Sequence, residues 1–277
     1  MEFGYSVLMS VYGKEKPHWL RQSMESIYEQ TVKTDNFVLV CDGPLPEALN
    51  KVIEEMQQKF GECLYIHRLA ENGGLGRALN IGIKDCRHEL VARMDSDDIS
   101  YQKRCEKELY VFERHPEISI VSGTVDEFTA DIHDIQGRRT VPEHQRDILS
   151  FAKRRNPFNH PCVMYKKSAV EKAGGYEEFF LLEDYFLWIR MLQCGFRGYN
   201  IGESLLAMRV NEGFYERRGG MRYALSQVKL MQYMRSIGFI TEFQCCLQSL
   251  IRTAAALAPN SMRRLLFQSM VRQTHGQ

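Results

Sequence analysis

The chain has 277 residues, of which 44% are hydrophobic and 26% are charged, and this composition excludes disordered, collagen-like and low-complexity proteins. The net charge is only +1, from 36 Lys and Arg against 35 Asp and Glu, so a protein that grips nucleic acid with a uniformly basic surface is also excluded. The charge is unevenly distributed, because from Arg209 to Gln277 ten basic side chains stand against three acids. The last quarter of the chain is therefore basic and the remainder acidic.

The eight cysteines are scattered, without a CxxC pair or a metal-binding spacing. A chain of this length does not need disulfides to fold, so we expect reduced thiols in a cytoplasmic protein. The first residues lack the basic and apolar regions of a signal peptide, and no stretch of about 20 uncharged apolar residues predicts a membrane-spanning helix.

Short apolar runs alternate with helical patterns through the first half of the chain. The predicted strands are Tyr5–Val11, Phe37–Cys41, Cys63–His67, Leu90–Met94 and Ile118–Ser122. The predicted helices between them are Trp19–Gln30, Pro46–Phe60, Gly76–Lys84 and Gln102–Arg114. This alternation predicts an α/β fold, with a mostly parallel central sheet that has helices on both faces and binds ligands where its strands end.

The second half of the chain is less regular at first and then helical. Loops and short strands are expected from about residue 125 to 158, where Asp, Gly and Pro are frequent. Next come a predicted strand, Pro161–Tyr165, and five predicted helices, Lys167–Ala173, Glu183–Cys194, Leu225–Ile237, Ile240–Ala258 and Met262–Arg272. We therefore expect one domain over residues 1–215, with halves 1–124 and 125–215, and a basic amphipathic helical extension over residues 216–277.

The sharpest local motif is Asp95-Ser96-Asp97-Asp98, which directly follows the predicted strand Leu90–Met94. Three carboxylates within four residues repel one another unless a cation or several hydrogen-bond donors lie among them. Carboxylate oxygens are ligands that Mg²⁺ and Mn²⁺ prefer, and these ions often bridge to substrate phosphates. The motif indicates a metal site at the edge of the sheet, the alternative being a solvated acidic turn in which Asp98 caps the next helix.

Three further patterns gain weight only in combination. Asp42-Gly43 follows the second predicted strand and by itself is an ordinary turn. The segment Asn72-Gly73-Gly74-Leu75-Gly76-Arg77 permits close backbone approach and carries an arginine that fits a phosphate, although it also suits a tight turn before a helix. Glu183-Asp184 begins a helix, where acids are favoured by the helix dipole. With Trp188 one turn along, this pair also suits a carboxylate base beside a flat platform for a sugar ring.

In this order along the chain, the four patterns resemble the family-2 glycosyltransferases, which are inverting enzymes with the GT-A fold. The resemblance covers about residues 4–215 and includes the first predicted strand, Asn159-His160-Pro161-Cys162 and Gly174-Gly175-Tyr176. A narrower similarity, through Arg217-Arg218-Gly219-Gly220 and Pro259-Asn260-Ser261, is to bacterial O-antigen and exopolysaccharide glycosyltransferases, including the amylovoran type.

The resemblance implies a binding site for a nucleotide sugar. Asp42 matches the acid that binds the uracil or ribose, Tyr12 suits a stacking partner for the uracil, and Arg77 suits a contact to the donor phosphate. Asp95 and Asp97 match the two metal-binding acids of the family, with Asp95 directed also toward the ribose. The implied cofactor is Mn²⁺ or Mg²⁺.

The resemblance also implies an acceptor site. Asp184 matches the catalytic base, and Glu183 matches the neighbour that shapes the acceptor site, to which we add Trp188. Many relatives supply a late histidine to the metal, but this chain has Asn211 there, so either Asn211 or water would complete the metal shell.

The implied reaction is transfer of a hexose, glucose or galactose, from a UDP-sugar to an acceptor hydroxyl with inversion. The basic amphipathic extension predicts peripheral association with the anionic inner face of the plasma membrane, so we expect the acceptor sugar to be linked to a lipid diphosphate. A helical pair packed on the domain or in a dimer is the alternative interpretation of the extension. No nucleic-acid partner is expected.

Two other functions fit parts of the pattern. A sugar-phosphate nucleotidyltransferase shares the α/β plan, but its first strand is followed by a loop rich in glycine and arginine, where this chain reads Val11-Tyr12-Gly13-Lys14-Glu15. A non-catalytic scaffold that binds UDP-sugar would not need both Asp97 and Asp184. The product distinguishes a glycosyltransferase from a nucleotidyltransferase, because the glycosyltransferase releases UDP and the nucleotidyltransferase releases pyrophosphate.

Overall fold

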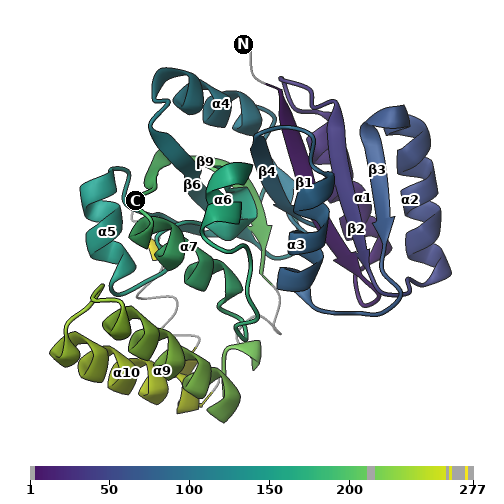
Figure 1. Ribbon diagram of the computed structural model, residues 1–277. Coiled ribbons are helices and arrows are strands. Elements are labelled where there is room, and N and C mark those ends of the chain that lie inside the picture. The colour runs from purple at the N-terminus through teal and green to yellow at the C-terminus, as the bar shows by residue number, and fades with distance from the viewer. Residues whose placement is uncertain (1–3, 211–215, 260–261, 264–271, 274–277) are drawn as a thin grey trace.

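One sheet runs through the molecule, with the strand order β10-β7-β6-β8-β4-β1-β2-β3 and with β9 pairing both β5 and β6 (Figure 1). The computed structural model describes residues 4–210, 216–259, 262–263 and 272–273. The expected α/β architecture with helices on both faces of the sheet is confirmed.

The first half of the chain builds the parallel part of the sheet, as predicted. Strands β1 (Tyr5–Tyr12), β2 (Asn36–Asp42), β3 (Leu64–Arg68) and β4 (Leu90–Asp95) lie in the order β3-β2-β1-β4. Tyr12 is in register with Asp42, and Ser10 with Asp95. Three strand ends therefore meet at the same edge of the sheet, where the polar motifs were expected to converge.

Helices cover both faces because the side chains of buried strands alternate between the two faces. Val7 and Met9 of β1 pack against α1 (Pro17–Tyr28), α2 (Glu47–Phe60) and α4 (Arg104–Arg114). Leu8 packs on the opposite face with α3 (Leu75–Asp85), α6 (Lys167–Lys172) and α7 (Glu183–Gln193). The core thus consists of two apolar layers with the sheet between them.

Beyond β4 the sheet is mixed rather than parallel. Strand β8 (Met164–Lys166) runs antiparallel to both of its neighbours, β4 and β6 (Ile118–Phe128). The remaining elements of this region are β5 (Ile99–Ser100), β7 (Ile135–Arg139), α5 (Gln145–Ala152) and β9 (Arg197–Arg209). The strand expected over Pro161–Tyr165 is shorter, because a 3₁₀ turn occupies His160–Cys162.

Sequence reasoning did not predict β9. Its first residues include Gly198, Asn200 and Gly202, which do not form an apolar run. It is nevertheless held along most of β6 as a parallel partner, with register shifts at three places. Such a strand depends on its tertiary partner rather than on local propensity.

The predicted C-terminal helices are confirmed as α9 (Met221–Ser236) and α10 (Glu242–Leu257), which pack as a pair (Figure 1). Leu230, Met231 and Met234 of α9 are buried in the same apolar layer as α7. The helix expected at Met262–Arg272 is described only at its ends, and Arg272 there belongs to strand β10 (Arg272–Gln273). No described helix is long and apolar enough to cross a bilayer.

Candidate active site

A cleft of about 1500 Å³ opens where β1, β2 and β4 end. It is bounded on the far side by the segment after α5, by the start of α7 and by α9 and α10. Six of the predicted site residues line it, namely Tyr12, Asp42, Asp95, Asp97, Glu183 and Asp184. Arg77 and Trp188 do not.

The acidic motif forms a compact cluster at one end of the cleft. Oxygens of Asp95, Asp97 and Asp98 all lie within 4.8 Å of one another. Burial raises the pKa values of Asp97 and Asp98 well above their ordinary range, and the charges of the neighbouring aspartates raise them further. Because a divalent cation would remove this repulsion, the donor set fits Mg²⁺ or Mn²⁺.

A buried arginine, Arg93, lies beneath this cluster and donates two hydrogen bonds to the two carboxylate oxygens of Asp95. It is 1% exposed and extends from the same strand, two residues before Asp95. Burying a charge is costly unless it is paired, which explains the bidentate contact. Sequence reasoning missed Arg93, although an arginine inside the apolar strand Leu90–Met94 was a visible sign of a buried ion pair.

The end of β9 fixes the other two acids. The backbone N–H of Arg209 donates to Asp98 Oδ1 at 2.7 Å, and the Arg209 side chain donates to the carbonyl of Asp97 at 3.0 Å. The guanidinium also lies over the rings of Trp19 and Phe128. Asn211, the expected alternative metal ligand, follows two residues later and lies outside the described residues.

Asp42 organises the glycine-rich segment. Its carboxylate accepts the backbone N–H groups of Gly73 and Gly74 at 2.8 and 3.0 Å and the side-chain amide of Asn72 at 3.0 Å. Gly74 has φ +87°, a conformation that glycine adopts without strain. Asp42 is 3% exposed, and its hydrogen bonds hold this loop at the floor of the cleft.

Tyr12 and Arg77 differ in their access to the cleft. The Tyr12 ring is 40% exposed and lines the cleft beside the acidic cluster, where a planar base has room to stack. The Arg77 side chain instead pairs with Glu71 at 3.2 Å and is about half exposed outside the cleft lining. The arrangement in this structure therefore does not bring Arg77 to the place expected for a donor phosphate.

Asp184 lies at the other end of the cleft, in the first turn of α7. Its two oxygens accept hydrogen bonds from the Asn156 side chain and from the Tyr185 backbone N–H, each at 2.7 Å. Burial raises the pKa of Asp184, and these two hydrogen bonds, with the charges of Arg93 and Arg218, oppose the rise. Burial also raises the pKa of Glu183, to about 7. Both acids therefore hold a proton more tightly than a free carboxyl does, and Asp184 is the one that a side-chain amide orients.

The prediction that Trp188 offers a platform to a sugar is wrong. Its side chain is 0% exposed and packs against the rings of Phe158, His160 and Tyr165. The position one turn after Asp184 faces the sheet, because α7 is buried along most of its length. Trp188 is a core residue that supports the helix carrying Asp184.

The comparisons with known proteins agree with this geometry. Residues 6–174 match the model of the family described as glycosyl transferase family 2. This chain belongs to that family. The region matched by the family model holds the acidic cluster and the Asp42 loop.

Two relatives of the glycosyltransferase match it over almost their whole length. The amylovoran biosynthesis glycosyltransferase AmsE of Erwinia amylovora is 38% identical over 95% of this chain and 98% of its own. The UDP-Gal:alpha-D-GlcNAc-diphosphoundecaprenol beta-1,3-galactosyltransferase of Escherichia coli is 35% identical, with 97% of each chain covered. The expected similarity to exopolysaccharide enzymes of the amylovoran type is confirmed.

A solved structure shares the fold of the enzyme. The mannosyltransferase PcManGT from Pyrobaculum calidifontis, in complex with GDP-Man and Mn²⁺, superposes with a TM-score of 0.66 at 14% identity. The match covers 97% of this chain and 80% of that one. The glycosyltransferase thus has the expected GT-A fold.

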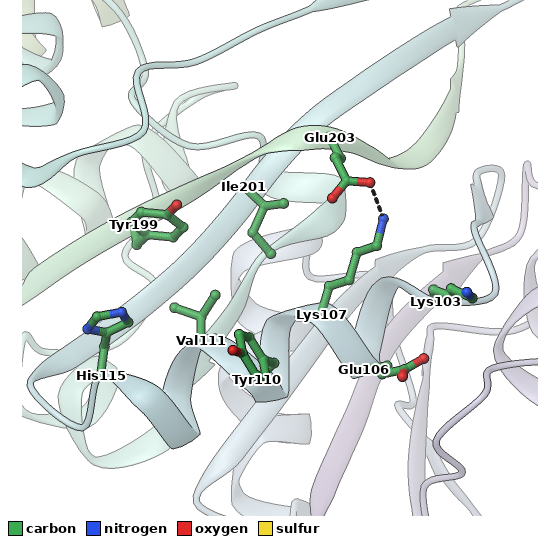
Figure 2. A pocket seen from close by; sticks show the side chains of 9 residues that line it. All are labelled: Lys103, Glu106, Lys107, Tyr110, Val111, His115, Tyr199, Ile201 and Glu203. Atoms are coloured by element: carbon green, nitrogen blue, oxygen red, sulfur yellow. Dashed lines mark hydrogen bonds and ion pairs between the residues drawn. The ribbon is translucent and has the colours of Figure 1, made fainter.

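The enzyme also has a smaller hollow, of about 510 Å³, between α4 and β9 (Figure 2). Lys107 reaches across it to Glu203, with 2.6 Å between the charged atoms. None of the predicted site residues lines this hollow, and lysines and glutamates balance one another around it. The large cleft is therefore the candidate active site.

Besides Arg93, sequence reasoning missed Glu15 and Asn156, two further polar residues of the cleft. Glu15, in the loop after β1, accepts a hydrogen bond from Ser96 at 2.6 Å and adds to the negative charge around Asp97. Asn156 fixes Asp184. Neither belongs to a pattern that is visible along the chain, because each works only with a partner far away in sequence.

Proposed function

We propose that this family-2 glycosyltransferase transfers a hexose, glucose or galactose, from a UDP-sugar to a sugar hydroxyl on a lipid-diphosphate-linked acceptor, with inversion, in bacterial O-antigen or exopolysaccharide synthesis. The observation that carries the proposal is the presence of the Asp95–Asp97–Asp98 cluster and the anchored Asp184 carboxylate in one cleft. The Escherichia coli relative, named as a UDP-Gal transferase acting on a diphosphoundecaprenol acceptor, supports the donor and acceptor classes.

The donor is bound at the end of the cleft that holds the acidic cluster. Tyr12 stacks on the uracil, and Asp42 contacts the uracil or ribose from the loop that it organises. Asp95 and Asp97 hold Mn²⁺ or Mg²⁺, with Asp98 beside them. When bound, such an ion supplies positive charge that stabilises the departing diphosphate. Arg93 orients Asp95 through its bidentate ion pair.

Asp184 receives the proton in the transfer step. The acceptor hydroxyl oxygen forms a bond to the anomeric carbon, the bond from that carbon to the diphosphate oxygen breaks, and the hydroxyl proton passes to a carboxylate oxygen of Asp184. One displacement inverts the anomeric carbon and releases UDP. Asn156 and the Tyr185 N–H orient the carboxylate, while Glu183 shapes the space for the acceptor.

The exposed face of α10 supports peripheral binding to the anionic inner face of the plasma membrane. Phe243 and Leu250 are 74% and 70% exposed, and Leu247 and Ile251 lie between and beside them along the helix. An amphipathic helix of this kind rests its apolar side in the interface of a bilayer. A lipid-linked acceptor would then reach the cleft from the membrane.

Vesicle binding tests this membrane proposal. Phe243→Ser with Leu250→Ser should lower partition onto anionic vesicles by about tenfold or more, since each side chain loses on the order of 1.5–3 kcal/mol of burial. High salt should partly reproduce the loss. Tyr110→Ser, an exposed aromatic on α4, is the matched control. Equal partition of all variants would mean that the α10 face contacts protein instead.

The transferase reaction is tested by product release. A panel of nucleotide sugars is tested with an alkyl diphosphate-linked N-acetylglucosamine as acceptor. The reaction should give UDP and one glycosylated product. NMR should show that the anomeric configuration of the new linkage is opposite to that of the donor. Release of pyrophosphate from a sugar phosphate and a nucleoside triphosphate would instead identify a nucleotidyltransferase. Binding of UDP-sugar without any product would identify a scaffold.

A further inference from the structure

Arginine side chains are concentrated on the side of the cleft that holds Asp184. Arg154 and Arg155 follow α5, Arg218 precedes α9, and Arg252 comes from the middle of α10. All four line the cleft, and they are called the arginine wall below. Three separate segments of the chain contribute to this wall, so it is a product of the tertiary structure.

Two of the wall arginines, Arg154 and Arg252, have no acidic partner among the described residues. Arg252 donates to uncharged acceptors, the side chain of Gln227 and the carbonyl of Arg154. Its buried Nε has no hydrogen-bond partner in the part of the chain that the structure describes.

The arginines also repel one another. Burial lowers the pKa of Arg155, and the charges of Arg252 and Arg154 lower it further. Burial likewise lowers the pKa of Arg218 to about 10; the charges of Arg139 and Arg217, which lie outside the wall, lower it further, and Tyr223 and Asp184 oppose the fall. Such crowding is costly in the free protein and is relieved by a bound anion. One guanidinium group can donate two parallel hydrogen bonds to two oxygens of a phosphate. A ligand that carries phosphate therefore fits this wall.

The surroundings of the wall distinguish between the two diphosphates in the proposed reaction. The donor diphosphate is assigned to the acidic cluster, which needs a cation to hold it. The wall lies instead beside Asp184, because Asn156 follows Arg155 directly and binds Asp184 Oδ2. On its other side the wall continues into the apolar face of α10, since Ile251 lines the cleft, is 45% exposed and adjoins Arg252.

We propose that the arginine wall binds the diphosphate of the lipid-linked acceptor, so that the sugar is directed toward Asp184 and the hydrocarbon toward the apolar face of α10. This inference rests on the proposed function and specifies how its acceptor is recognised. The order of charge and apolar surface along the cleft, carboxylate, arginines and then exposed apolar side chains, matches a sugar, a diphosphate and a lipid in sequence. The wall residues are positioning residues, since they contact the acceptor away from the reacting atoms.

The test uses the full chain and two soluble acceptors, N-acetylglucosamine joined to an alkyl chain through a diphosphate and the alkyl glycoside without phosphates. Arg154→Gln with Arg155→Gln should raise KM for the diphosphate acceptor by about tenfold to a hundredfold, as expected when hydrogen bonds to a charged group are lost. The donor KM and kcat at saturating acceptor should stay within about twofold. Arg154→Lys with Arg155→Lys should recover part of the loss, and Arg114→Gln on α4, far from α10, should change nothing (Figure 1).

Unchanged acceptor KM in the Gln variant would overturn the proposal, as would an equal rise for the acceptor without phosphates. A raised donor KM would assign the wall to the UDP-sugar instead. Loss of binding to anionic vesicles with an unchanged acceptor KM would assign it to lipid headgroups. Calorimetric binding of the diphosphate acceptor alone, compared between wild type and the Gln variant, tests the wall even if no transfer is found. Absence of UDP release by the wild type would therefore count against the proposed function and not against the wall.

Discussion

The two ends of the cleft carry opposite charge. At the proposed donor end, Asp95, Asp97, Asp98 and Glu15 crowd together beside two buried arginines, Arg93 and Arg209. At the proposed acceptor end, the four wall arginines line the cleft together with Asp184, which is held by neutral donors. An excess of carboxylates requires a cation before it can hold an anionic diphosphate, whereas an excess of guanidinium groups binds one directly. If the proposed assignments hold, the same cleft distinguishes two diphosphates by whether a metal is needed.

The largest effect is expected from removal of the metal site. Asp97→Ala should abolish transfer, because the variant lacks a carboxylate that we propose as a ligand of the metal. A chelator should abolish the transferase activity of the wild-type protein until Mn²⁺ or Mg²⁺ is added back. The measurement is UDP release. Asp134→Asn, an exposed acid outside the cleft, is the control. Full activity in excess EDTA would remove the metal from the proposed mechanism.

The next largest effect concerns the base at the acceptor end. Asp184→Asn preserves shape and removes basicity, so kcat should fall by roughly 10²-fold or more while the affinity for UDP-sugar stays normal. Glu183→Gln should act more weakly and mainly through acceptor KM. If Asp184→Asn turns over normally, or loses donor binding in proportion to its rate, Asp184 is a structural residue at the start of α7.

A moderate effect on stability follows from the raised pKa values of Asp97 and Asp98. Both acids hold protons more tightly in the folded chain than in the unfolded chain, where their pKa values are near 3.8. The folded state therefore loses stability as pH rises above about 4 and through the raised pKa values. In EDTA, Tm should fall between pH 5.5 and 8, and Mn²⁺ should raise Tm more at pH 8 than at pH 5.5.

The Asp97→Asn variant is an internal control for this pH dependence of Tm. Asp97→Asn should raise Tm of the EDTA-treated protein at pH 8, by about 2–4 °C for each kcal/mol of repulsion removed, and should weaken the response to Mn²⁺. Glu183 and Asp184 also have raised pKa values, but they are present in both proteins and cancel. A lower Tm for the variant at pH 8 would show that Asp97 stabilises the metal-free fold.

The smallest effect is expected at Arg77. Because its guanidinium pairs with Glu71 outside the cleft lining, Arg77→Gln should change kcat and the donor KM by less than about twofold. The measurement is donor titration by UDP release. A donor KM raised tenfold or more would show that the glycine-rich segment rearranges on binding and brings Arg77 to the phosphate, as the family resemblance implies.

The sequence by itself determined the parallel half of the fold and the location of the acidic cluster beside Asp42. Strand β4 reads as an apolar run, its end is marked by three aspartates, and Asp42 ends the neighbouring strand, so the carboxyl ends of a parallel sheet had to bring them together. The two C-terminal helices were also readable from their apolar spacing.

Only the tertiary structure decided the acceptor end. Trp188 lies at a helical position that suits either a sugar platform or a core residue, and its contacts with Phe158 and Tyr165 made it a core residue. Arg155, Arg218 and Arg252 are unremarkable surface-type residues in the sequence and become a wall only because α5, α9 and α10 converge. The physical reason is the distance along the chain between the residues involved. Strand ends and helix faces follow from local periodicity. A cluster of charged side chains from distant segments depends on tertiary packing, which no local pattern encodes.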